Sequence, residues 1–451
     1  MSAPLLVPLF ALGVLLLASA LRVRQRRADS HKRGAIIEPL PRISALPRLG
    51  SFGVKPALRF AGVPISAQDE CKHFKLVGTT GTGKSTAIAR LLAGALERGD
   101  RALITDPDGG YLARFYDRYR GDIILNPFES QSVRWDPFAE IRNAYDVEQL
   151  ASGLIATSDD ASGREWRGYA RTFFVAVARR CHERGGYDAA RLWHLLTVAS
   201  SRELRALVAG TPAQPFMEPE NARMLGSIRS VAASAAAALE IIQRQRGKAF
   251  SVREWVASGR GVLFLPYQAG QIAALRSMIA AWVRLAIFEA MSQPEHDQHL
   301  WFVMDELDAL GPIDGLKDAL ARLRKYGGRC VLGFQSIAQI SGSYGVSDAQ
   351  TIVENCGNTL ILRCSASEQG GTAQFASRLI GEREVIRQQD SRAQDFQSLL
   401  SFQGARRSRS VSQQHVTETA VLPSEIEQLP DLHGYVKTAS ARAWRRVVLT
   451  R

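Results

Sequence analysis

The 451-residue sequence predicts an α/β fold: a doubly wound, mostly parallel sheet with an inserted all-α domain and one N-terminal transmembrane helix. Three observations lead to this prediction. From about residue 58, short apolar runs alternate with helical stretches, as expected of parallel strands covered on both faces. Residues 145–258 contain no convincing strand and have helical spacing. Residues 5–21 are apolar and carry no charge.

The N-terminal segment predicts a single-pass membrane anchor. As a helix, residues 5–21 would span ~25 Å, slightly less than the ~30 Å hydrocarbon core of a bilayer. The basic run 22–27 follows directly, and no Lys or Arg precedes the apolar run. Because positive charge keeps its side of a membrane segment in the cytoplasm, we expect the bulk of the chain there. Ala18-Ser-Ala20 also resembles a cleavage site, so a cleaved signal peptide and a buried apolar helix are the alternatives.

Composition limits the partners only loosely. The net charge is +13, but residues 1–48 hold eight Lys or Arg against two acidic residues, a net charge of +6. Basic residues beside a membrane segment are a topology signal, and the remaining charge permits DNA binding without requiring it. The five cysteines are scattered without a C-x-x-C pair, which is typical of reduced, buried cysteines rather than a disulfide framework or zinc site.

Five segments follow from these patterns. They are an anchor with a basic flank at 1–27, a proline-containing linker at 28–57, a nucleotide-binding domain in two parts at 58–144 and 259–451, and an all-α domain inserted at 145–258. The polar, basic stretch 402–416 is predicted to be a mobile loop. The candidate strands are His73–Val77, Ala102–Thr105, Asp122–Leu125, Val262–Leu265, Trp301–Met304, Cys330–Gly333, Thr359–Leu362 and Tyr435–Lys437.

The strongest motif is a phosphate-binding loop. Residues 78–85 read GTTGTGKS, fit G-x-x-x-x-G-K-[ST], and lie between an apolar strand and a helix. Glycines let backbone N–H groups surround an anion, and the helix N-terminus adds a positive dipole. We expect Lys84 on the β- and γ-phosphates and Ser85 on Mg²⁺, with a plain glycine-rich turn as the alternative. The predicted ATP-binding residues are Gly78, Thr79, Thr80, Gly81, Thr82, Gly83, Lys84, Ser85 and Thr86.

An acidic pair ends a second apolar strand, at Asp305 and Glu306. Asp305 suits outer-sphere contact with Mg²⁺, and Glu306 suits polarisation of the attacking water. A turn or helix cap is the alternative. The pair lies 221 positions after Lys84, which agrees with an insertion inside a P-loop NTPase domain.

Three further positions carry weaker signals. Gln335 ends a strand and is expected to sense the γ-phosphate; a satisfied polar residue is the alternative. Arg324 lies near a helix C-terminus, where cations are common; we favour it as an arginine finger for a neighbouring subunit, with Arg322 and Lys325 as rivals. The segment 106–110 (DPDGG) either lines the nucleotide site or is a turn.

The chain resembles the type IV secretion coupling proteins of bacterial conjugation, the TraD/TrwB type, over about residues 60–440. The resemblance rests on both nucleotide motifs and on the strings DPDGG, IILNPF, EIRNAYD, DELDAL, GFQSIAQI, YGVSDAQ and LPSEIEQLPDLHGYV. It implies a RecA-like homo-hexamer at the bacterial inner membrane, with an all-α domain facing the cytoplasm. It also implies a DNA-dependent ATP hydrolase whose partners are single- or double-stranded DNA, a relaxase and the secretion channel proteins. The positions matching the family pattern are Lys84, Ser85, Asp305, Glu306, Arg324 and Gln335.

Two features depart from that family, and other functions stay open. Typical members have two transmembrane helices, and some have an acidic tail; here we identify one apolar segment and a basic end. The alternatives are a translocase for chromosome segregation or protein secretion, and a receptor whose ATP binding only controls assembly. Arg406, Arg407 and Arg409 are candidate contacts to DNA phosphates, against a solvated loop.

Overall fold

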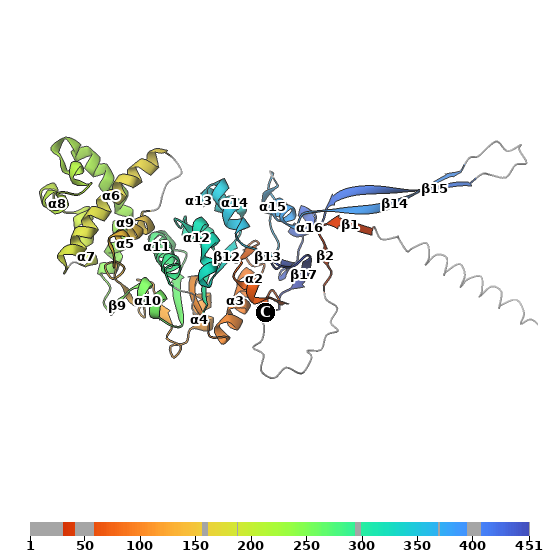
Figure 1. Ribbon diagram of the computed structural model, residues 1–451, viewed down its shortest axis with the longest axis horizontal. Helices are drawn as coiled ribbons and strands as arrows, with labels where there is room; N and C mark the ends of the chain where they lie inside the picture. Colours follow the sequence, from red (N-terminus) through yellow and green to blue (C-terminus); the bar gives the residue numbers. More distant parts are fainter. Residues whose placement is uncertain are drawn as a thin grey trace, which may run out of the picture. The chain divides into compact units, whose positions relative to one another are not determined.

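The computed structural model describes residues 30–40, 58–155, 161–186, 188–293, 299–368, 370–394 and 407–450. The predicted membrane anchor lies outside these residues. The chain forms two compact units, Met1–Ile37 with Ser377–Leu422 and Glu38–Ala376 with Pro423–Arg451. Figure 1 shows the helices and strands of both units.

The second unit is built around a ten-stranded sheet with the order β2-β17-β16-β13-β5-β12-β11-β6-β10-β7. Pairing is parallel from β13 to β7 and antiparallel in β13–β16–β17. All eight predicted strands form, so the mostly parallel α/β sheet is confirmed, while β2 and β17 were not predicted. The strand bounds are β2 (Ile37–Glu38), β5 (Phe74–Val77), β6 (Arg101–Pro107), β7 (Ile123–Ile124), β10 (Val262–Tyr267), β11 (Leu300–Met304), β12 (Gly328–Phe334), β13 (Asn358–Ile361), β16 (His433–Lys437) and β17 (Trp444–Val448).

Both faces of the central strands are buried, which explains their continuous apolar runs. Every residue of β5, β10, β11 and β12 is buried. One face packs against α3, where Ile88 and Leu92 join a core cluster with Phe74 and Trp301. Four of the five cysteines are buried, and all five are free thiols. The helices of this region are α2 (Ala67–Glu70), α3 (Lys84–Glu97), α4 (Gly110–Phe115), α11 (Ile272–Ala290), α12 (Leu316–Leu323), α13 (Ile337–Tyr344), α14 (Val346–Glu354), α15 (Gly371–Ile380) and α16 (Pro423–Glu427).

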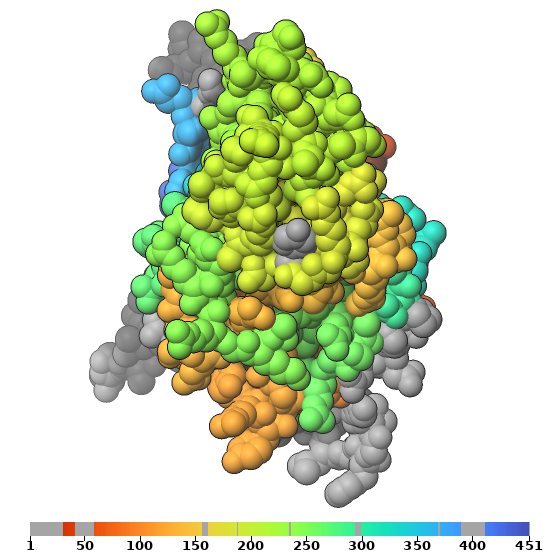
Figure 2. All heavy atoms as spheres, turned by 90° about the vertical axis from the view of Figure 1, so that its left-hand side faces the viewer, coloured from red at the N-terminus to blue at the C-terminus, as the bar shows by residue number. Residues whose placement is uncertain are grey.

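A run of helices lies between β8 (Arg134–Trp135) and β9 (Ala249–Phe250), which form a two-stranded sheet of their own. Figure 2 shows its yellow to light-green atoms gathered over one face of the unit. The expectation of an interval without strands is wrong at β9, because two residues pair in parallel with β8 and close the insertion at its base. The helices between them are α5 (Ala144–Leu154), α6 (Ala161–Arg184), α7 (Ala189–Thr197), α8 (Ser201–Val208) and α9 (Ala222–Gln243), and α10 (Val252–Ser258) follows β9.

One buried carboxylate ties the two ends of this insertion together. Glu140 is fully buried, and its Oε1 accepts hydrogen bonds from Trp135 Nε1 at 2.8 Å and Val252 N at 2.7 Å. Its Oε2 accepts from Ser251 Oγ at 3.0 Å and Arg253 N at 3.1 Å. An anion at a helix N-terminus is stabilised by the N–H groups and dipole there. Glu140 therefore anchors the start of α10 to the chain that precedes the insertion.

The first unit contains a three-stranded antiparallel sheet in the order β1-β14-β15. Its strands are β1 (Ser30–Gly34), β14 (Glu382–Gln394) and β15 (Arg407–Thr419). The mobile-loop prediction for 402–416 is therefore wrong over 407–416, which pairs with β14. The β14–β15 pair, called the β14–β15 ribbon below, lacks an alternating apolar pattern. Cross-strand side-chain pairs stabilise it instead, such as the ion pair between Arg383 and Glu418 at 2.9 Å. Arg407 and Arg409 lie in β15, and Arg406 lies outside the described residues.

Within the ranges that the structure describes, no single helix is long and apolar enough to cross a bilayer. The bent pair Pro219–Ala233 and Ala236–Gln243 meets that test together, by length and composition only.

Candidate nucleotide-binding site

The loop between β5 and α3 has the backbone conformation that an anion site needs. Gly81 and Gly83 adopt left-handed φ values of 77° and 115°, which side-chain-bearing residues rarely adopt. A Cβ at Gly83 would also lie 2.8 Å from the Leu432 side chain. Among the described residues, no side chain caps the N-terminus of α3. The N–H groups of its first turn therefore face the loop without a side-chain partner, as phosphate binding requires.

Lys84 is held at this loop by its own backbone. It is 7% exposed, and Nζ donates to Gly78 O at 2.7 Å and Thr79 O at 3.1 Å. Burial lowers the pKa of Lys84 from its usual value, and the nearby carboxylates of Asp305 and Glu306 oppose this shift. An ammonium kept close to two carbonyl oxygens and two acids is placed to meet phosphate oxygens that enter the loop.

Ser85 and Asp305 lie in direct contact although they are far apart in the sequence. Ser85 Oγ, in the first turn of α3, donates to Asp305 Oδ2 at 2.6 Å. Asp305 follows β11 and is 2% exposed, and within the described chain its other oxygen, Oδ1, has no hydrogen-bond partner. Mg²⁺ prefers carboxylate, hydroxyl and water oxygens. A hydroxyl beside a buried carboxylate with one unsatisfied oxygen therefore fits a magnesium site.

Glu306 and Gln335 form a bridge from the acidic strand to the phosphate loop. Gln335 Nε2 donates to Glu306 Oε1 at 3.2 Å, and Thr80 Oγ1 donates to Gln335 Oε1 at 3.0 Å. Burial raises the pKa of Glu306, and the Asp305 and Asp308 carboxylates raise it further. A raised pKa makes Glu306 a better proton acceptor than an ordinary surface carboxylate.

These residues line one pocket of about 340 Å³ at the carboxyl edge of the sheet. Gly78, Thr79 and Thr82 are not in its lining; Thr82 Oγ1 donates to Thr79 O and braces the loop from within. The lining also includes positions that motif analysis missed, Asp431 and Leu432 near the C-terminus. The full lining is Thr80, Gly81, Gly83, Lys84, Ser85, Thr86, Pro107, Asp108, Asp305, Glu306, Gln335, Asp431 and Leu432.

The C-terminal segment holds the phosphate loop by its backbone. Leu432 N donates to Thr82 O at 3.0 Å, and Leu432 itself has a left-handed φ of 64°. Beside it, Arg363 pairs with Asp431 at 2.6 Å. No local sequence signal marks this contact, because it depends on where the strand β16 returns to the sheet.

Arg324 does not reach this pocket. It begins the short helix η4 (Arg324–Tyr326), is exposed, and precedes β12. β12 is seven residues long, ~23 Å at ~3.3 Å per residue, runs parallel to β5 and ends directly before Gln335. Arg324 therefore lies at the amino edge of the sheet, roughly 20 Å from the nucleotide pocket of its own chain.

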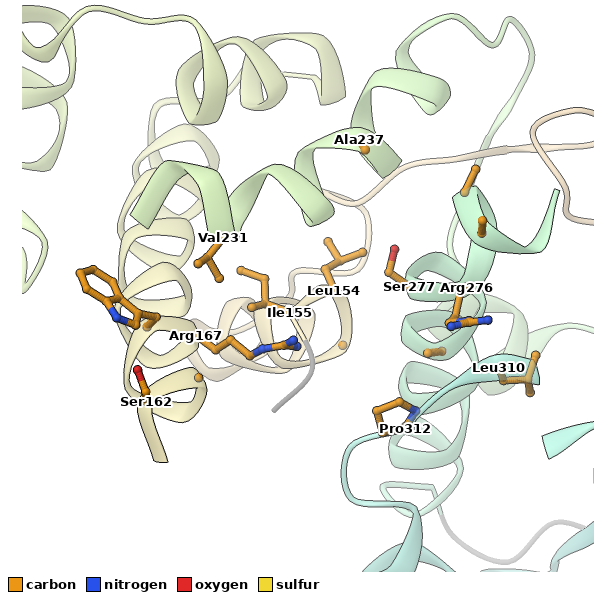
Figure 3. Close-up of a pocket in the computed structure, with 16 residues that line it drawn as sticks. Leu154, Ile155, Ser162, Arg167, Val231, Ala237, Arg276, Ser277, Leu310 and Pro312 are labelled. Carbon is orange, nitrogen blue, oxygen red and sulfur yellow. The ribbon is translucent and has the colours of Figure 1, made fainter. Parts of the chain in front are cut away.

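A larger pocket, of about 890 Å³, lies between α5, α6, α9 and α11 (Figure 3). Its wall is mostly apolar, with Leu154, Val231 and Leu310, and it contains Arg167 and Arg276. No acidic side chain in the described part of the chain lines it. It lacks the amide-lined loop and the carboxylates that a nucleotide and its metal require, so the smaller pocket is the candidate nucleotide site.

The DPDGG segment reaches the same site from β6. Pro107 and Asp108 line the pocket. Burial raises the pKa of Asp106 to about 6, although its carboxylate accepts hydrogen bonds from Tyr111 N and Leu112 N. Tyr111, which motif analysis missed, donates its hydroxyl to Asp305. The segment thus lines the site rather than forming a distant turn.

Comparisons with known proteins agree with this geometry. A family model described as the type IV secretion-system coupling protein DNA-binding domain matches residues 57–450. Coupling protein TraD of Escherichia coli strain K12 is 30% identical over 389 residues, which are 84% of this chain and 52% of TraD. The chain thus spans about half the length of that curated relative.

Solved structures are similar over nearly the whole chain. Unbound conjugative coupling protein TrwBdeltaN70 has a TM-score of 0.79 at 32% identity and covers 93% of this chain and 95% of its own. Plasmid coupling protein TrwB in complex with ADP and Mg²⁺ has a TM-score of 0.77 at 32% identity, covering 89% and 90%.

Proposed function

This chain belongs to the type IV secretion-system coupling protein family, and from that premise we propose that it is a membrane-anchored, DNA-dependent ATPase of bacterial conjugation. It couples a relaxase–DNA complex to a type IV secretion channel and drives DNA transfer. The observation that carries the proposal is the pocket that joins the phosphate loop, the Ser85–Asp305 pair and Glu306. The ADP and Mg²⁺ bound by the TrwB relative support the same ligands here.

The proposed chemistry is hydrolysis of ATP to ADP and phosphate. The loop amides and Lys84 bind the phosphates, and Ser85 and Asp305 hold Mg²⁺, which neutralises charge on the β- and γ-phosphates when bound. Glu306 accepts a proton from water as the water oxygen attacks the γ-phosphorus and the bond to the β-phosphate oxygen breaks. Gln335 contacts both Glu306 and Thr80, so it is the side chain through which a change at the γ-phosphate position is transmitted to β12.

Replacing Glu306 by glutamine removes the proton acceptor but keeps the size of the side chain. We expect ATP binding within about threefold of wild type and a kcat lowered by about 10²–10³-fold. Stopped-flow binding of a fluorescent ATP analogue and steady-state phosphate release measure the two quantities. Glu354→Gln changes an exposed carboxylate of α14 and should leave both unchanged. A Glu306→Gln variant with near-normal kcat would assign the base to another group.

The assembly, location and domain roles are further parts of the proposal. Residues 1–27 anchor the chain in the bacterial inner membrane, and 58–144 with 259–451 form the motor domain of a homo-hexamer. The helices within 145–258 form the all-α domain, and relaxase and channel proteins are the partners. Support comes from the family match and from the helical run between β8 and β9.

DNA stimulation separates the proposed motor from a receptor whose ATP binding only controls assembly. We expect single-stranded DNA of unrelated sequences to raise ATP turnover of the detergent-solubilised protein. The stimulation should be lost between about 50 and 200 mM salt, because phosphate contacts release counterions. Turnover is measured with and without DNA at both salts. Turnover that is equal in all four conditions would favour the receptor, and stimulation by unfolded polypeptide in place of DNA would favour a protein-secretion motor.

A further inference from the structure

Tyr111 contacts Asp305 of the proposed magnesium site, although no sequence motif indicates a role for it. It is the second residue of α4, is 5% exposed, and its hydroxyl donates to Asp305 Oδ2 at 2.8 Å. The bond joins residues 194 positions apart. A buried tyrosine hydroxyl usually has a hydrogen-bond partner, and here that partner is the carboxylate expected to contact the metal.

The turn before α4 fixes the position of the Tyr111 side chain. β6 and β11 are parallel neighbours, and Thr105 pairs with Met304, so the residues that follow this pair, Asp106 and Asp305, lie side by side. Asp106 is fully buried and accepts from Tyr111 N at 3.0 Å and Leu112 N at 2.6 Å. These bonds fix the start of α4. Gly109, with a φ of 71°, makes the sharp turn that allows it.

Both hydrogen bonds to Asp305 go to the same oxygen. Oδ2 accepts from Ser85 Oγ at 2.6 Å and from Tyr111 at 2.8 Å, whereas Oδ1 has no partner in the described chain. Two donors from different elements restrict rotation of the carboxylate.

We propose that Tyr111 is a positioning residue for the magnesium site: its hydrogen bond holds Asp305 Oδ2 beside Ser85 Oγ. The proposal rests on the proposed nucleotide site. If Ser85 and Asp305 hold Mg²⁺, Tyr111 would still orient the carboxylate, because it approaches from α4 and not from the phosphate loop. Groups that orient metal ligands in this way typically affect metal affinity by about 10–100-fold.

The test is Tyr111→Phe in the full chain, which removes one oxygen and keeps the buried ring. Binding of fluorescent ADP is measured first in EDTA and then across a Mg²⁺ titration, so that hydrolysis is not needed. We expect ADP affinity in EDTA within twofold of wild type. The Mg²⁺ concentration that gives half of the metal-dependent gain should rise about tenfold. Thermal unfolding checks that the variant stays folded.

Tyr267→Phe is the matched control. Tyr267 is 4% exposed and lies near the charges of Asp305 and Glu306, but its hydroxyl has no hydrogen-bond partner among the described residues. Its removal should leave the Mg²⁺ midpoint unchanged. In an Asp305→Asn background, Tyr111→Phe should add no further shift, because a group that acts only through Asp305 is not additive with its loss.

Three results overturn the proposal. A Mg²⁺ midpoint within twofold of wild type in Tyr111→Phe shows that Asp305 does not need this bond. Equal loss of ADP affinity with and without Mg²⁺ shows a general packing effect. Full additivity with Asp305→Asn shows action elsewhere. Failure of the proposed function looks different, since wild type itself would then bind no ADP in either condition.

Discussion

ATP hydrolysis is expected to fall below detection, by about 10³-fold or more, when Lys84 is replaced by alanine. The ammonium is the one cation in the nucleotide pocket lining of the described chain, and it lies within 3.1 Å of two loop carbonyls. Without it, the phosphates lose the one cationic side chain that the described part of their own subunit places in a pocket that also contains Asp305, Glu306 and Asp108. Steady-state phosphate release and fluorescent-nucleotide binding measure the effect.

The fold should survive this change. Lys84 Nζ donates two hydrogen bonds, to the backbone carbonyls of Gly78 and Thr79. Lys84 is not part of the apolar core, so its loss leaves the packing of the core intact. Thermal unfolding and the elution volume of the solubilised protein should therefore match wild type. Lys317→Ala is the control, since that lysine pairs with Asp348 outside the nucleotide pocket and should keep full activity. Persistent hydrolysis in Lys84→Ala would mean that ATP is bound at another site.

A loss of about 10³–10⁵-fold in turnover of the assembled protein is expected for Arg324→Ala, with ATP binding unchanged. Arg324 is exposed and lies at the edge of the sheet opposite the pocket of its own chain. At roughly 20 Å it cannot touch that nucleotide, so any effect on chemistry must reach the pocket of another subunit. Turnover is measured as a function of protein concentration, because a finger acts only in the assembly.

Mixed assemblies distinguish action between subunits from action within one. Lys84→Ala subunits keep Arg324, and Arg324→Ala subunits keep the phosphate loop. Combining the two inactive variants should restore part of the activity if each intact loop receives the arginine of a neighbour. No recovery, or normal activity of Arg324→Ala alone, would reject the assignment. Arg322→Ala and Lys325→Ala test the two neighbouring cations in the same way.

The nucleotide site could be predicted from local strings because its chemistry is concentrated in two short segments. The phosphate loop and the Asp305–Glu306 pair each follow an apolar strand, and parallel strands bring their carboxyl ends to one edge of the sheet. Gln335 belongs to the same edge for the same reason. Leu432 could not be predicted, since its contact with Thr82 depends on how β16 turns back antiparallel to β13.

The β14–β15 ribbon shows the opposite case. Its strands are polar, so the apolar alternation by which strands are predicted is missing, and the sequence of 402–416 predicts a loop. The strands form because each residue of one finds a partner on the other, from Glu382 opposite Thr419 to Gln394 opposite Arg407. Such pairing is a property of two segments together and leaves no pattern in either one alone.

The sequence by itself determined the α/β class, the eight predicted strands, the order of the motifs and the catalytic edge of the sheet. These depend on apolar periodicity and on loop chemistry that is complete within about ten residues. Only the tertiary structure decided that Tyr111 holds Asp305, that Leu432 braces the phosphate loop and that Arg324 faces away from its own pocket. Those contacts join residues far apart in the chain, and their geometry is set by strand order and packing, which no local pattern encodes.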